Sequence, residues 1–102
     1  MNIFAEIRTS VIETLDAMVA EGHLPTGLSW GNVAVEPPRD AAHGDMATNA
    51  AMVLAKPAGK SPRDIATELA TRLTQDPNID TAEVAGPGFL NLRLTPAVWH
   101  DV

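Results

Sequence analysis

The sequence predicts an α+β fold of two layers, in which a small antiparallel or mixed sheet packs on helices that cover one of its faces. Two observations support this. Three segments repeat apolar residues at three- and four-residue spacing, which is typical of helices with one buried side. Short β-prone segments, bounded by glycine and proline, lie between and after these helices. The length of 102 residues is sufficient for a single domain spanning residues 1–102.

The first expected element is a helix over residues 2–21. Asn2 is a suitable N-cap, Gly22 is placed to end the helix, and Pro25 follows beyond it. Charged residues fall largely between the apolar positions. The apolar stripe consists of Ile3, Phe4, Ile7, Val11, Leu15, Met18 and Val19.

A short strand is expected at residues 33–35, ended by Pro37-Pro38 because proline cannot donate to a strand ladder. A loop over residues 39–45 follows. We then expect a second helix from Met46, with Asp45 as its N-cap, until "PAGK" breaks it. Its apolar stripe would be Met46, Ala50, Val53 and Leu54.

The clearest helix lies at residues 61–75. Ser61 is placed as the N-cap, Pro62 occupies the first helical position, and Asp64 lies in the first turn, where a carboxylate favours the helix dipole. A turn is expected at residues 76–80. The buried stripe of the helix would be Ile65, Leu69 and Leu73, with Ala66 and Ala70 beside them.

Two strands, residues 81–85 and 88–94, form a predicted hairpin around a Gly-Pro-Gly break, and a further helix is expected to begin at Pro96. Side chains alternate along a strand, so Leu90, Leu92 and Leu94 share one face and are expected in the core. The opposite face carries Phe89, Asn91 and Arg93.

We call Phe89, Asn91 and Arg93 the Phe89 strip, and this strip has two interpretations. In one, Phe89 packs under a neighbouring element and Arg93 pairs with a carboxylate. In the other, the strip binds unpaired RNA bases, because an aromatic ring stacks on a base, asparagine offers a donor and an acceptor, and arginine can contact phosphate. Patterning alone favours the packed interpretation.

The charge balance disfavours general nucleic-acid binding. The chain has 13 acidic and 7 basic side chains, a formal net charge of -6, whereas nucleic-acid binders usually show a basic footprint. One local basic cluster stands out, Lys56, Lys60 and Arg63, which is either a solvated surface or a phosphate contact at the start of the helix after Ser61.

There is no cysteine, and no apolar run approaches the roughly 20 residues of a membrane helix. We also expect no secretory signal, because a basic segment followed by a continuous apolar stretch is missing.

Motifs for autonomous chemistry are weak. His43 and Asp45 form only part of a metal or acid–base site, which needs further ligands, so a loop turning on Gly44 is favoured. The Gly-Lys-Ser at residues 59–61 lacks the first glycine of a phosphate loop and follows a helix rather than a strand. We therefore expect no catalytic residue and no metal site in this chain.

Three blocks, "EPPRDAAHGDMATNAAMVLAK", "SPRDIATELA" and "VAGPGFLNLRL", resemble the N-terminal additional domain of bacterial arginyl-tRNA synthetases in order and spacing. The resemblance implies contact with the D-loop at the outer corner of tRNA(Arg), where Phe89 and Asn91 would read an unpaired base. The family often has tyrosine at the aromatic position, so stacking without a hydroxyl is implied here. It also implies a mainly structural role for "HGDMATN", with His43 and Asn49 near the RNA. Backbone contacts by Arg93, Lys56, Lys60 and Arg63 are inferred from charge alone.

The resemblance also implies a larger enzyme. Intact, it would attach arginine to tRNA using ATP with Mg²⁺, while this fragment would hold no cofactor and would lack the catalytic and anticodon-binding domains. The expected partners are tRNA(Arg) and the catalytic domain of its own chain, in a cytoplasmic monomer without a membrane. Two alternatives stay open, a protein–protein interaction or assembly domain that uses its open sheet face, and a small enzyme that uses His43 and Asp45.

Overall fold

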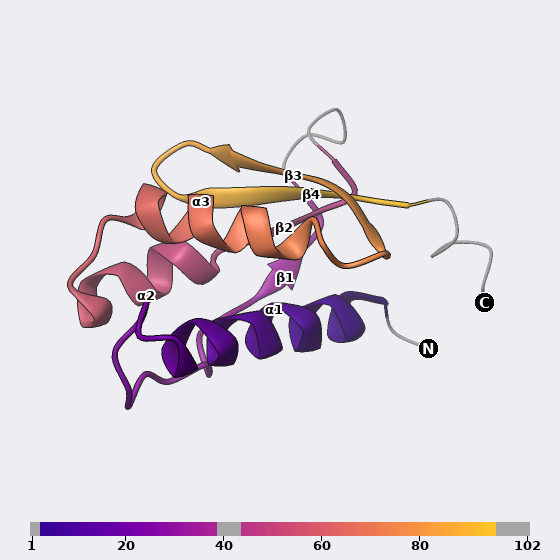
Figure 1. Ribbon diagram of the computed structural model, residues 1–102. Helices are drawn as coiled ribbons and strands as arrows, with labels where there is room; N and C mark the ends of the chain where they lie inside the picture. The colour runs from indigo at the N-terminus through magenta and orange to yellow at the C-terminus, as the bar shows by residue number, and fades with distance from the viewer. Residues whose placement is uncertain (1–2, 39–43, 96–102) are drawn as a thin grey trace.

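The structure is a computed structural model that describes residues 3–38 and 44–95. Figure 1 shows three helices gathered on one side of a twisted sheet. The predicted two-layer α+β fold is confirmed. The elements are α1 (Ile3–Ala20), β1 (Val35–Glu36), β2 (Met46–Thr48), α2 (Ala50–Ala58), α3 (Pro62–Leu73), β3 (Ile79–Ala85) and β4 (Phe89–Leu94).

The sheet has the strand order β1-β2-β4-β3, and every neighbouring pair is antiparallel. β4 is therefore hydrogen-bonded along both edges, to β2 and to β3. The predicted hairpin of β3 and β4 is confirmed. The order of the other strands could not be predicted, because β2 joins β4 across more than 40 residues of sequence.

The core lies between the sheet and the helices. Leu90, Leu92 and Leu94 are buried on one face of β4, as their alternation predicts. α3 packs against β3 and β4, α2 against β4, and α1 against α3 and β1. The predicted stripe of α3 is buried throughout, and α1 ends before Gly22, whose φ of 83° lies in the left-handed region. The helical contributions to the core include Ile7, Val11, Leu15, Met18, Leu54, Ile65, Leu69 and Leu73.

The expected helix from Met46 is wrong at its start. Residues 46–48 form β2, which pairs Met46 with Leu92 and Thr48 with Leu90. Asp45 does not cap a helix; its side chain accepts a hydrogen bond from the backbone N–H of Leu94, at 2.8 Å. The sheet thus overrides the helix propensity of this alanine-rich stretch.

Other boundaries also shift. α2 begins at Ala50, contains Pro57 in its last turn and ends with Gly59 as its C-cap, within the expected "PAGK" break. β1 lies at Val35–Glu36 instead of residues 33–35, because only these two residues pair with β2. β3 begins at Ile79, inside the expected turn, with a register shift between Ile79 and Thr81. The Asn2 cap and the helix from Pro96 lie outside the described residues.

Candidate nucleic-acid interface

The sheet face opposite the helices carries a row of four side chains, one from each strand. Glu36 pairs with Ala47, Ala47 pairs with Asn91, and Asn91 pairs with Glu83. Paired residues share a face, and Asn91 points away from the buried leucines beside it. An amide and two carboxylates are therefore spread across the open face, with a small alanine between Glu36 and Asn91.

A hollow of about 480 Å³ lies on this open face. It extends from β1 and the two prolines after it, across β2, to the β3–β4 turn. Ala47 contributes only a methyl group, which leaves space between its two larger neighbours in the row. We call this feature the sheet hollow; its lining includes Glu36, Pro37, Pro38, Ala47, Phe89 and Asn91.

Phe89 borders the sheet hollow at the start of β4. Its side chain is 40% exposed, and it is the single large exposed hydrophobic residue in the described ranges. The ring is thus not packed under a neighbouring element, as one interpretation of the sequence required. Asn91 is half-buried and lies two residues further along the same face. An exposed aromatic ring therefore stands beside a polar amide at the edge of a concave surface.

The turn before Phe89 is fixed on the first residues of α3. Arg63 donates a hydrogen bond from Nη1 to the carbonyl oxygen of Gly86, at 2.9 Å. Gly88 has a φ of +154°, and a Cβ atom built on it would lie 2.5 Å from Cβ of Pro62. Only glycine fits so close to the helix. This contact sets the position from which Phe89 enters the sheet.

Asn49 also lines the sheet hollow, but its amide is already used. Its Oδ1 accepts a hydrogen bond from Ala34 N–H at 2.8 Å, and its Nδ2 donates to the carbonyl oxygen of Asn32 at 3.2 Å. The residue holds the segment that leads into β1 close to the end of β2. Within residues 3–38 and 44–95, by contrast, no side-chain hydrogen bond or ion pair involves Asn91 or Glu36.

The predicted basic residues do not line the sheet hollow. Lys56 and Lys60 are exposed at and just beyond the end of α2, and Arg63 is tied to the turn at Gly86. Arg93 is exposed on β4, on the same face as Phe89 and Asn91. The structure thus brings Phe89 and Asn91 together at the hollow and leaves Lys56 and Lys60 apart from its lining. His43 lies outside the described residues.

Sequence reasoning missed Glu36 and Ala47 as part of the site. They come next to Asn91 only through the pairing of β1 with β2 and of β2 with β4. β1 has two residues and β2 has three. No alternation is visible in segments this short, so the sequence held no signal for the row.

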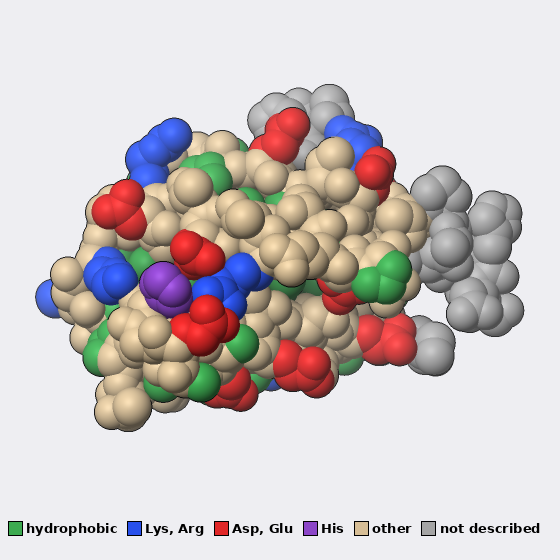
Figure 2. All heavy atoms as spheres, viewed as in Figure 1, with side chains coloured by type: hydrophobic (Ala, Val, Ile, Leu, Met, Phe, Trp, Pro, Cys, Tyr) green, Lys and Arg blue, Asp and Glu red, His purple; other side chains and the backbone are tan. Residues whose placement is uncertain are grey.

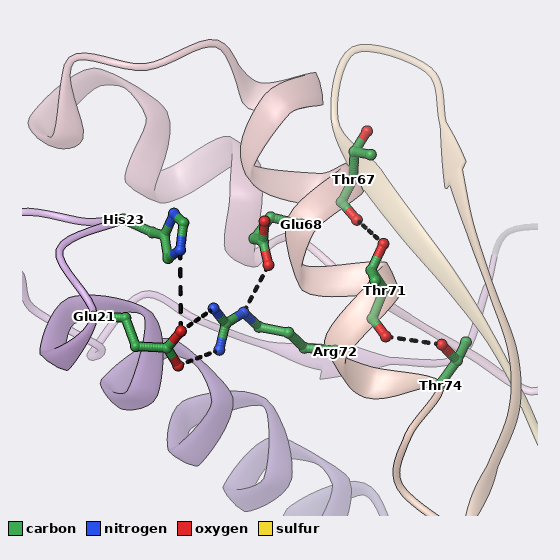
Figure 3. Close-up of polar contacts among 7 residues, drawn as sticks. All are labelled: Glu21, His23, Thr67, Glu68, Thr71, Arg72 and Thr74. Atoms are coloured by element: carbon green, nitrogen blue, oxygen red, sulfur yellow. Dashed lines mark hydrogen bonds and ion pairs between the residues drawn. The ribbon is translucent and has the colours of Figure 1, made fainter.

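A charged cluster occupies the opposite, helical side of the molecule (Figure 3). Arg72 of α3 donates to both carboxylate oxygens of Glu21, at 2.8 and 2.9 Å, and to Glu68 at 2.7 Å. The hydrogen bond from Arg72 lowers the pKa of Glu21. His23 lies 4.0 Å from Glu21. Figure 2 shows basic, acidic and histidine side chains intermixed on this face, and the cluster joins the end of α1 to α3.

No metal site is visible in the described part of the chain. No group of three or more histidine, cysteine, aspartate or glutamate side chains there could hold an ion. Nor is any helix in the described ranges long and apolar enough to cross a membrane. The distinctive feature is therefore the open sheet face rather than a cluster of ligands.

A family model described as the arginyl tRNA synthetase N terminal domain matches residues 5–94. The chain belongs to this family. The match includes all seven described helices and strands except the first two residues of α1, and it includes the whole sheet hollow. The resemblance seen in the three sequence blocks is thereby confirmed.

Curated relatives with the name arginine–tRNA ligase support the family assignment. The chain is 71% identical to the enzyme of a Ruegeria species and 69% identical to that of Paracoccus denitrificans, each over all 102 residues. It spans 18% of the length of these relatives.

Solved structures of arginyl-tRNA synthetases share the fold of this family member. The enzyme of Thermus thermophilus matches with a TM-score of 0.62 and 27% identity, covering 89% of this chain and 14% of that one. The enzyme of Plasmodium falciparum matches with a TM-score of 0.73 and 14% identity, covering 94% and 16%. The second likeness concerns the fold alone.

Proposed function

We propose that this chain is one tRNA-recognition domain, residues 1–102, of an arginine–tRNA ligase, and that its open sheet face contacts the D-loop of tRNA(Arg) at the outer corner of the molecule. The observation that carries the proposal is the exposed Phe89 ring beside Asn91 at the sheet hollow. Binding sites are typically concave and combine aromatic side chains with a few polar groups, so an exposed phenylalanine beside an amide at a hollow is a candidate binding residue.

Phe89 stacks on an unpaired base, and Asn91 hydrogen-bonds to the edge of that base. Sequence-specific RNA recognition uses single-stranded loops, whose bases can leave the stack and pack on aromatic rings. Stacking is worth roughly 1–3 kcal/mol per base. Within the described ranges no side-chain hydrogen bond involves Asn91, so its amide can offer a base edge both a donor and an acceptor.

Phosphate contacts are secondary in this proposal. Lys56, Lys60 and Arg93 are exposed, and Arg63 keeps N–H donors beyond the one used at Gly86. A net charge of -6 opposes strong backbone binding. We therefore propose that the chain by itself binds tRNA weakly and in a salt-sensitive way, and that it adds selectivity to an enzyme whose other domains supply affinity. Nanomolar binding by the chain alone at physiological salt would contradict this.

The chemistry belongs to the rest of the enzyme. In the proposed whole protein, ATP with Mg²⁺ activates arginine in a catalytic domain that this chain contacts, and arginine is then attached to tRNA. This chain contributes no catalytic residue, cofactor or metal. We propose that the enzyme acts as a monomer in the cytoplasm, where translation takes place.

Charging kinetics test the proposal in an arginine–tRNA ligase that carries this domain. Phe89→Ala and Asn91→Ala should each lower kcat/KM for tRNA(Arg) by roughly 5- to 150-fold, the equivalent of 1–3 kcal/mol. The KM values for ATP and arginine should not change. Thr81→Ala is a matched control, because Thr81 is exposed on the same sheet face but does not line the sheet hollow. Thermal unfolding should confirm that all three variants fold.

The alternatives have distinct outcomes. If Phe89→Ala leaves charging intact but abolishes binding of a protein partner, the open face is an assembly surface. If the chain binds metal stoichiometrically, a site with His43 and Asp45 returns to consideration. The Asp45 carboxylate, however, is already engaged by the backbone N–H of Leu94.

A further inference from the structure

The sheet hollow has two polar groups on opposite sides. Asn91 lies on β4 and Glu36 on β1, with Ala47 of β2 between them. Two strand spacings separate their backbones, about 10 Å. The amide of Asn49 is committed to backbone groups, and the Thr48 hydroxyl donates to the carbonyl of Ala34. Among the described residues that line the sheet hollow, the polar side chains left to meet a ligand are therefore those of Asn91 and Glu36.

These two groups differ in what they can recognise. An amide both donates and accepts hydrogen bonds, whereas an ionised carboxylate only accepts them. Among the described residues that line the sheet hollow, Glu36 is the one with an ionisable side chain. A phosphate or a carbonyl-rich edge would be repelled at this side, while a group with N–H donors would be bound.

We propose that Glu36 is a specificity-determining residue of the sheet hollow, whose carboxylate accepts a hydrogen bond from the exocyclic amino group of the base that stacks on Phe89. The inference rests on the proposed base-reading function and adds the class of base. Adenine, cytosine and guanine carry an amino group, and pairing of a carboxylate with such a group is a known mode of base readout. Uracil presents carbonyl oxygens beside its single N–H and is disfavoured.

The neighbouring surfaces fit a planar ligand with that orientation. Phe89 contributes an aromatic ring to the lining near the β3–β4 turn, and Pro37 and Pro38 contribute apolar atoms next to Glu36. The small side chain of Ala47 leaves space for the base between them. A base could thus direct its amino edge to β1 while its plane contacts the ring, and its sugar and phosphate would stay outside, away from the carboxylate.

Charging of altered transcripts tests this in an arginine–tRNA ligase that carries the domain. Each unpaired D-loop base of a tRNA(Arg) transcript is replaced in turn by A, C, G and U, and kcat/KM is measured. At the position that the domain reads, the unmodified enzyme should prefer an amino-bearing base to U by roughly tenfold. Glu36→Gln should bring this ratio near one, since an amide can accept or donate.

Glu83→Gln is the matched control. Glu83 lies in the same row on the other side of Asn91, is exposed, and does not line the sheet hollow. Both changes remove one negative charge from the same face, so a general electrostatic effect on RNA would be equal in the two variants. The proposal requires that Glu83→Gln keep the discrimination ratio.

Each other outcome has a separate meaning. If both glutamine variants raise charging of all transcripts alike, Glu36 acts only through its charge, and the specificity role is wrong. If Glu36→Gln keeps the normal ratio while Phe89→Ala loses charging, the base site stands without Glu36. If Phe89→Ala charges normally, the proposed function fails, and the role of Glu36 fails with it.

Discussion

Two asparagines at the sheet hollow show how the same side chain serves structure in one place and is left available in another. Asn49 satisfies backbone groups of Ala34 and Asn32, whereas Asn91 carries no side-chain hydrogen bond within the described residues. Buried or half-buried polar groups are usually paired, so an unpaired amide on a concave surface points to a ligand. The sequence does not distinguish the two, because each is simply an asparagine beside a strand.

Asn49→Ala should destabilise the fold, because two backbone groups near β1 lose their partner. The expected cost is roughly 1–2 kcal/mol, which corresponds to a Tm lower by about 5–15 °C in a domain of this size. Asn91→Ala is the control and should leave Tm nearly unchanged. Thermal unfolding followed by circular dichroism decides between them. An equal loss of Tm in both variants would contradict the division of roles.

Alternation along β4 predicted the Phe89 strip correctly, and it predicted the buried leucines on the other face. The partners of the strip were not predictable. Ala47 lies in a segment whose sequence predicts a helix. Glu36 belongs to a two-residue strand that is defined only by its pairing with β2. Half of the candidate site thus followed from local patterning, and the other half required pairing between distant segments.

At the level of elements, the β3–β4 turn depends on α3. The glycine at position 88 meets Pro62 so closely that no side chain fits, while nothing lies within 4 Å of a Cβ atom placed on Gly86. The two glycines therefore serve different purposes. Gly86 allows a φ of +56°, and Gly88 allows the turn to contact the helix.

Gly88→Ala should cost more stability than Gly86→Ala. The change at Gly86 brings only the left-handed backbone penalty of about 1–2 kcal/mol. At Gly88 we expect overpacking against Pro62 to add roughly 1–3 kcal/mol. Urea unfolding of the two variants gives the comparison directly. Equal midpoints would mean that the turn can move away from α3 without loss.

The ends of long periodic helices were predictable from the sequence, whereas the start of β3 was not. α1 and α3 have long periodic stripes and were placed within two residues at each end. In β3, Ile79 pairs with Leu94, but Thr81 already pairs with Arg93, so Asp80 is an extra residue. This bulge puts Ile79 on the same face as Ala82 and Val84. The two-residue alternation is broken there, so the start of the strand could not be recognised from the sequence pattern.

At the scale of the whole molecule, the cluster of Glu21, Glu68 and Arg72 joins the first helix to the third across 51 residues of sequence. Arg72 lowers the pKa of Glu21 by donating hydrogen bonds to it, and Glu21 in turn raises the pKa of Arg72. A carboxyl with a lowered pKa stabilises the fold above its ordinary pKa, and the stabilisation is lost as the pH falls through the lowered value.

Glu21→Gln should therefore lower Tm slightly near neutral pH. The difference from the unmodified chain should vanish as the pH falls through the lowered pKa of Glu21, because both side chains are then uncharged. Half of the Glu21 side chain is exposed, so added salt should also reduce the difference. Melting curves from about pH 7 to about pH 3 test this. A difference that persists at the acid end would exclude the ion pair as its cause.

Because β4 is paired along both edges, its backbone is already ordered before any proposed binding of RNA. A strand paired along both edges opens only when the domain unfolds globally, so its amide protons should exchange with solvent last. Phe89 and Asn91 stand on this backbone. In the proposed complex a base would dock on a backbone that is already fixed by pairing, so little backbone entropy would be lost on association. The proposed base-reading residues and the centre of the sheet therefore share one strand.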